Sequence, residues 1–191
     1  MNIRRNHIIY RNLIMKNAPV FWLTGMSGSG KSTLASGLES IISKSYKICI
    51  VDGDDVRDKD DTKLGFGYDD VLINNSRIAN YCNNIRSEYD LIIVPVIAPY
   101  NDIRLITRKS LEPNFHLVYL KSDIKSLRDR DTKGLYLASD KGRITDLIGY
   151  SESNPYEVPI KPELVIDTSN KASQRESVSI FYKYVDNIIS H

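Results

Sequence analysis

A glycine-rich segment near the start of the chain constrains its fold more than any other feature. The segment reads Gly25-Met26-Ser27-Gly28-Ser29-Gly30-Lys31-Ser32-Thr33, which is a complete Walker A phosphate loop. Glycines allow a tight loop whose amides turn inward around bound phosphates. Lys31 is then placed to reach the β- and γ-phosphates of a nucleotide, and the Ser32 hydroxyl is placed to ligate Mg²⁺.

The residues on either side of this loop have the pattern that the motif requires. Residues 20–23 read as a short buried strand, and the stretch after the loop predicts a helix over 31–43 through the spacing of Leu34, Leu38, Ile41 and Ile42. The N-terminus of such a helix adds its positive dipole end to the phosphate site. This context disfavours the alternative, a chance loop rich in glycine and serine.

Short apolar runs alternate with longer amphipathic stretches along the rest of the chain. Further strands are expected at 46–51, 91–97, 115–120 and 164–166. Apolar residues at helical spacing predict helices around 78–89, 103–111 and 178–189. Alternation of this kind predicts a three-layer α/β domain with a five-stranded parallel sheet between two layers of helices.

Length and composition favour one ordinary globular domain. We expect a single domain at 18–191, after a basic N-terminal extension at 1–17. The net charge of +2 gives no case for a nucleic-acid partner. No apolar run has the length of a membrane span, and the N-terminal residues lack a secretory pattern. Cys49 and Cys82 are expected to be reduced thiols, which favours a cytoplasmic protein.

Two polar, glycine-bearing segments, at 52–70 and 129–162, interrupt the alternation. In α/β phosphotransferases long segments of this kind serve as substrate loop and lid, and the alternative is plain surface loop. Asp52 and Asp54 follow the second strand, at the sheet edge where ligands bind. Asp54 is the candidate for orienting or deprotonating an attacking hydroxyl, and Asp52 is the candidate for supporting either Mg²⁺, through water, or the loop. Arg57 either binds an anionic substrate group or neutralises the acidic cluster around it.

Five motifs, in order over residues 19–168, resemble the adenylylsulfate (APS) kinase family. They are Asp52 to Arg57 with Leu64-Gly65-Phe66, the strand from Leu91 to Pro99-Tyr100, Arg130-Asp131-Thr132-Lys133-Gly134-Leu135-Tyr136, Pro155-Tyr156-Glu157, and Pro162 to Thr168. The resemblance implies a P-loop kinase fold with a lid. It also implies a homodimer that uses ATP and Mg²⁺ to phosphorylate the ribose 3′-hydroxyl of a small nucleotide.

The resemblance also implies roles for individual residues. Asp54 and Lys31 carry the catalytic roles, and Ser32 and Asp52 the metal. The ATP-binding residues are Gly25, Ser27, Gly28, Ser29, Gly30, Lys31, Ser32, Thr33, Arg130 and Thr168. The acceptor-binding residues are Asp54, Arg57, Phe66, Asn74, Ile97, Lys133 and Leu147.

Two positions depart from the family pattern, and both concern the acceptor. Val71 stands where the family has an arginine that binds the acceptor, and valine offers neither charge nor donors. Leu147 aligns with a phenylalanine that stacks on the adenine of the acceptor, and Tyr150 is an alternative stacking residue. Ala98 replaces a serine that some members carry as a possible phosphate carrier, so direct in-line transfer is the mechanism that this strand supports.

These departures leave the donor half intact and favour a changed acceptor. The first hypothesis is cytidine diphosphoramidate, which relatives of the family phosphorylate in bacterial capsule modification, and the alternative is adenylylsulfate itself. A non-enzymatic nucleotide-binding module is disfavoured, because Lys31, Ser32, Asp52 and Asp54 are all present. A kinase for a non-nucleotide alcohol fits the phosphate loop but leaves Leu64-Gly65-Phe66 and the lid motif unexplained.

Overall fold

The computed structural model of the chain describes residues 17–53 and 64–190. Five strands form one parallel sheet in the order β2-β3-β1-β4-β5. Val20 of the central strand pairs with Ile92 on one side and with Phe115 on the other. The strands are β1 (Val20–Thr24), β2 (Ile48–Ile50), β3 (Leu91–Pro95), β4 (Phe115–Lys121) and β5 (Leu164–Asp167). The five-stranded parallel sheet confirms the predicted fold class.

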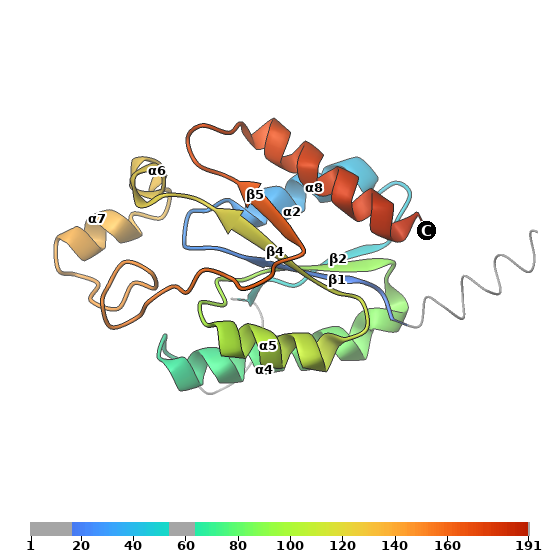
Figure 1. The fold of residues 1–191 in the computed structure, drawn as a ribbon, viewed down its shortest axis with the longest axis horizontal. Coiled ribbons are helices and arrows are strands. Elements are labelled where there is room, and N and C mark those ends of the chain that lie inside the picture. Colours follow the sequence, from blue (N-terminus) through green and yellow to red (C-terminus); the bar gives the residue numbers. More distant parts are fainter. Residues whose placement is uncertain (1–16, 54–63, 191) are drawn as a thin grey trace, which may run out of the picture.

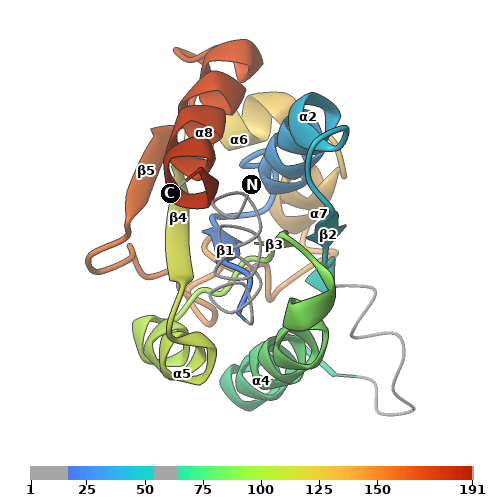
Figure 2. The same cartoon turned by 90° about the vertical axis from the view of Figure 1, so that its right-hand side faces the viewer.

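Helices cover both faces of the sheet, as Figures 1 and 2 show. One face carries α2 (Lys31–Ile42) and α8 (Gln174–Ile189), and the other carries α4 (Tyr68–Ile85) and α5 (Asn101–Leu111). A short 3₁₀ helix, η1 (Arg86–Glu88), follows α4. Two short helices, α6 (Ile124–Arg130) and α7 (Leu135–Asp140), lie together at one end of the molecule.

Side chains of β1 alternate between the two cores. Phe21 and Leu23 belong to the core beneath α2 and α8, where Phe181 is also fully buried. Val20 and Trp22 belong to the core beneath α4 and α5. Burial of an apolar side chain of this size stabilises the fold by about 1.5–3 kcal/mol. Because both faces are covered, every residue of β1 is buried, as expected for a central parallel strand.

The N-terminal half of α4 was not predicted. The apolar pattern indicates a helix only from about residue 78, whereas α4 begins at Tyr68. The first turns carry Asp69, Asp70, Asn74 and Asn75, and polar residues of this kind hide helical periodicity. Two of them, Asn74 and Asn75, are nevertheless buried.

A buried arginine fastens the sheet at the amino ends of its strands. Arg86 is 3% exposed. Its guanidinium donates to the carbonyl oxygens of Ala18 at 3.0 Å, Leu111 at 2.8 Å and Pro113 at 2.8 Å. A buried charge is tolerated only when its donors are paired in this way. Arg86 therefore joins the segments that lead into β1 and β4 at the edge opposite the phosphate loop.

No helix within residues 17–53 and 64–190 combines the length and the apolar character needed to cross a membrane.

Candidate active site

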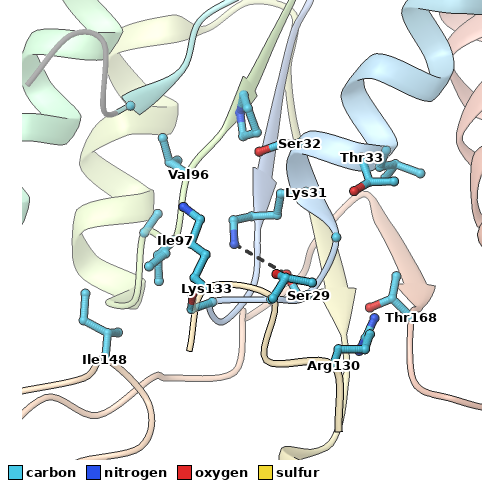
Figure 3. A pocket seen from close by; sticks show the side chains of 18 of the residues that line it. Ser29, Lys31, Ser32, Thr33, Val96, Ile97, Arg130, Lys133, Ile148 and Thr168 are labelled. Atoms are coloured by element: carbon cyan, nitrogen blue, oxygen red, sulfur yellow. Dashed lines mark hydrogen bonds between the residues drawn. The ribbon is translucent and has the colours of Figure 1, made fainter. Parts of the chain in front are cut away.

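A cavity of about 600 Å³ opens beside the phosphate loop. Segments distant in sequence line it: the loop itself, the residues after β2, the start of α4, the turn after β3, the lid and the loop after β5. Most of these segments follow the carboxyl ends of strands, which is where parallel α/β sheets bind their ligands. Figure 3 looks into this cavity.

The glycines of the phosphate loop are required for two different reasons. Gly28 and Gly30 have φ angles of 73° and 92°, in the left-handed region that favours glycine. Gly25 has no room for a side chain, because a Cβ there would lie 2.6 Å from Ser29 Oγ and 2.9 Å from the Leu120 carbonyl oxygen. The loop can therefore approach β4 closely and turn directly into α2.

Lys31 is held against the phosphate loop by hydrogen bonds to the loop backbone. Its side chain is largely buried, and its Nζ donates to the carbonyl oxygens of Gly25 at 2.8 Å and Met26 at 2.9 Å. Ser29 Oγ lies 3.5 Å away, the contact drawn as a dashed line in Figure 3. The lysine is thus fixed over the loop that would enclose the phosphates of a bound nucleotide.

Two oxygen-bearing side chains fit a magnesium ion in the same cavity. Ser32 is the second residue of α2, after Lys31, and Asp52 follows β2, and both line the cavity. Hydroxyl and carboxylate oxygens are ligands that Mg²⁺ prefers. The turn that carries Asp52 is pressed against the end of β3, since a Cβ on Gly53 would lie 2.8 Å from Val96 Cγ1. Asp54 and Arg57, the predicted catalytic and anion-binding residues, lie outside the described residues.

Arg130 and Thr168 mark one end of the cavity. Arg130 ends α6, and its guanidinium donates to the Ser126 carbonyl oxygen at 3.0 Å and to Ser122 Oγ at 2.8 Å. Thr168 follows β5, and its backbone N–H donates to the Lys121 carbonyl oxygen at 2.8 Å. Figure 3 shows these two side chains on the same side of the loop. The structure therefore brings together both predicted ATP-binding residues outside the phosphate loop.

Most of the predicted acceptor-binding residues also line the cavity. Phe66, Asn74, Ile97 and Lys133 all do so. In Figure 3, Ile97 and Lys133 lie across the lysine of the phosphate loop from Arg130. Phe66 is 45% exposed, so part of its side chain is accessible from solvent.

Val71 faces the cavity without bringing any charge to it. It is 4% exposed and packs with Tyr100 and Ile103. Val71 therefore forms part of the cavity wall. The wall at this point is apolar.

The lid places a different residue at the cavity from the one predicted. Leu147 is not among the lining residues, because its side chain packs with Leu127 and Tyr136 inside the lid. Ile148 lines the cavity instead. Tyr150, the alternative stacking residue, packs edge-on against Tyr136 and donates to Asp140 Oδ1 at 2.6 Å. The lid thus needs Leu147 and Tyr150 for its own small core.

This lid rests directly on the phosphate loop. The Tyr136 hydroxyl donates to the Ser27 carbonyl oxygen at 2.9 Å, and burial raises the pKa of this phenol to about 12. Gly149 has a φ of 79°, and a Cβ there would lie 2.7 Å from Met26 Cε. Tyr136 and Gly149 of the lid therefore lie against two consecutive residues of the loop, Ser27 and Met26.

A buried arginine that was not predicted from the sequence supports the part of the cavity wall formed by the turn after β3. Arg104, 3% exposed, donates to the carbonyl oxygens of Ala98 at 2.7 Å, Pro99 at 2.9 Å and Glu157 at 2.5 Å. Ala98 has a φ of 42°, which is rare for a residue with a side chain. Arg104 holds this turn and ties it to Glu157, in the C-terminal part of the lid segment. Its place on the apolar face of α5, one residue after Ile103, is the signal that could have identified it.

Comparisons with known proteins give one consistent result. The family described as adenylylsulphate kinase matches residues 17–167. The adenylyl-sulfate kinase of Bacillus pumilus is 37% identical over 168 residues, 87% of this chain and 84% of the relative. That of Bacteroides thetaiotaomicron is 37% identical over 87% of this chain and 83% of the relative. A solved Mycobacterium tuberculosis APS kinase in complex with AMPPNP and APS gives a TM-score of 0.79 at 27% identity, over 89% of this chain and 98% of that one.

Proposed function

Because the chain belongs to the adenylylsulfate kinase family, we propose that it moves the γ-phosphate of ATP to the ribose 3′-hydroxyl of adenylylsulfate. Membership of the family supports the general activity, which is that of an ATP-dependent, APS-kinase-like kinase that uses Mg²⁺. The observation that supports the acceptor is the shared cavity. It joins Lys31 of the donor half to Phe66 and Asn74 of the acceptor half.

The residues of this chain divide the work between binding and positioning. Loop amides and Lys31 hold the phosphates of ATP, and Arg130 and Thr168 contact the nucleotide beyond them. Ser32 and Asp52 hold Mg²⁺, which neutralises charge on the transferred group. Phe66, Ile97 and Lys133 position the acceptor so that its hydroxyl lies in line with the γ-phosphate. Asp54 orients that hydroxyl or takes its proton.

The test of this function is turnover with defined substrates. Purified protein is incubated with ATP, Mg²⁺ and adenylylsulfate, and both ADP and the 3′-phosphorylated nucleotide are quantified. We expect equal amounts of the two products. ADP without phosphorylated nucleotide, or no turnover with any nucleotide acceptor, would contradict the proposal and favour a binding module.

A second acceptor, cytidine diphosphoramidate, is favoured by the wall at Val71 and by Ile148. An uncharged valine and an aliphatic lid residue give an adenylylsulfate molecule neither an arginine fork nor a second aromatic ring. Loss of one charge-assisted hydrogen bond costs on the order of 1.5–3 kcal/mol, or about ten- to a hundredfold in affinity. Side-by-side kinetics decide between the two acceptors. A clearly higher kcat/KM for adenylylsulfate rejects this second one.

A further inference from the structure

Two neighbouring asparagines in α4 place polar groups in the wall of the cavity. Asn74 and Asn75 are 5% and 3% exposed, and both line the cavity. The Asn75 Nδ2 donates to the Val71 carbonyl oxygen at 2.8 Å, one turn earlier in the same helix. This bond fixes the orientation of the amide, so that its Oδ1 is directed away from the helix backbone carbonyl.

The remaining oxygen of each amide is unpaired. Asn74 Oδ1 and Asn75 Oδ1 are buried and have no hydrogen-bond partner among the described residues. Buried polar atoms in folded proteins are almost always paired, because an unpaired one has given up its water without compensation. Two such oxygens, on consecutive residues that line a substrate cavity, point to donors that arrive with the ligand.

The chemistry of this wall restricts what those donors can be. An amide oxygen only accepts hydrogen bonds, and the neighbouring Val71 contributes no charge. A terminal sulfate has no donor to offer these oxygens, whereas an N–H group has. The nucleotides proposed as acceptors carry N–H groups in two places: the amino group of the base and, in a phosphoramidate, the terminal amide.

We propose that Asn75 is a specificity-determining residue whose Oδ1 accepts a hydrogen bond from an N–H group of the acceptor nucleotide. The inference rests on the proposed function as a nucleotide 3′-hydroxyl kinase and adds a residue to its acceptor site. Asn74 already belongs to that site by family resemblance, whereas Asn75 was not among the predicted residues. Asn75 would bind the acceptor from a position one helical turn after Val71.

A purely structural role for Asn75 predicts different behaviour. Trp22 Nε1 is another buried atom without a partner among the residues described, so a trapped water in the core beneath α4 is the competing explanation. In that case a substitution at Asn75 changes the stability of the protein and leaves the kinetics with every acceptor alike.

The experiment compares Asn75→Leu with wild-type protein on four acceptors. These are adenylylsulfate, cytidine diphosphoramidate, CDP, which lacks the terminal amide, and uridine diphosphoramidate, which lacks the base amino group. Asn80→Leu is the matched control, since Asn80 lies on the same helix and is exposed. Melting temperature and affinity for an ATP analogue are measured for each variant.

We expect Asn75→Leu to lower kcat/KM about tenfold with the acceptor that supplies the N–H group, mostly through KM. If the terminal amide supplies it, the loss is confined to the two phosphoramidates. If the amino group of the base supplies it, the loss is confined to adenylylsulfate and the two cytidine nucleotides. Asn75→Asp keeps an acceptor oxygen and should preserve the preference for N–H-bearing acceptors.

Equal losses with all four acceptors, or no loss with any, overturn the role of Asn75. Either result leaves the kinase function standing, because it requires turnover. Absence of turnover by the wild-type protein with all four nucleotides is instead the failure of the proposed function itself.

Discussion

The two ends of the cavity differ in how firmly hydrogen bonds within the protein hold their side chains. At the donor end, Lys31 and Arg130 are each held by two or more hydrogen bonds within the protein. At the acceptor end, Phe66 is half-exposed and the Asn75 amide oxygen is unpaired. A preorganised donor end serves phosphoryl transfer whatever the acceptor is. Under the proposed function, the choice of acceptor therefore rests on a few side chains at the acceptor end, whereas the donor end serves the chemistry itself.

The largest effect should come from the donor end. Lys31→Met removes the charge that stabilises the transferred phosphoryl group, and we expect kcat to fall by at least about 100-fold. The loss should be the same with adenylylsulfate and with cytidine diphosphoramidate, because the residue serves both. Steady-state kinetics with each acceptor measure it. Lys44→Met, on an exposed lysine, is the matched control, and acceptor-dependent losses would break the division into two ends.

Restoring an arginine at the acceptor end should change selectivity rather than chemistry. Val71→Arg should raise the kcat/KM ratio of adenylylsulfate to cytidine diphosphoramidate by about ten- to a hundredfold, since it supplies a charged donor at the wall. Competition assays containing both acceptors measure the ratio directly. Ile73→Arg, on the exposed face of the same helix, should leave the ratio unchanged.

A smaller effect is expected where the lid touches the phosphate loop. Tyr136→Phe deletes the hydrogen bond to the Ser27 carbonyl oxygen and should weaken binding of an ATP analogue about threefold to tenfold. Calorimetric titration measures the affinity. Tyr150→Phe, which deletes a bond inside the lid, should have no such effect. A changed acceptor preference in Tyr136→Phe would show that the lid contact serves the acceptor end as well.

The smallest effect should come from the ion pair between Arg108 and Glu163, which lies at neither end of the cavity. Burial alone would raise the pKa of Glu163, but Arg108 and the Leu117 N–H lower it below its ordinary value. A lowered folded-state pKa stabilises the protein above the unfolded pKa, and this stability is lost as pH falls through the folded-state pKa. Glu163→Gln should therefore cost up to about 1 kcal/mol at pH 7 and less at pH 3.

Urea denaturation at the two pH values measures this difference. Kinetics with both acceptors at pH 7 should match those of the wild-type protein. A change in the kinetics with either acceptor would mean that the segment carrying Glu163 affects the cavity.

The sheet and the donor end were predictable from sequence because their signals are local. A phosphate loop is a contiguous motif, and a buried parallel strand is a continuous apolar run. The start of α4 was missed because its asparagines face a cavity, so polar residues stand on the buried side of the helix. Arg104 was missed because one of its partners, the Glu157 carbonyl oxygen, comes from a segment far along the chain.

In the lid, too, the sequence did not predict which residue lines the cavity. Alignment by motif selects Leu147, whereas the fold directs Ile148 to the cavity and uses Leu147 for packing. Two adjacent residues on an irregular segment can exchange such roles without any change in the sequence pattern. The backbone turns here at Gly149, whose φ is 79°, and Ile148 is the residue that lines the cavity.

The strand order has a consequence for synthesis on the ribosome. β1 leads into the phosphate loop, yet its two partners, β3 and β4, are translated much later. Pairing between strands so distant in sequence forms slowly. A nascent chain that has emerged only through α2 therefore carries the whole Walker motif without the sheet that shapes it. Competence to hold ATP arrives late in translation, after Lys121 has left the exit tunnel.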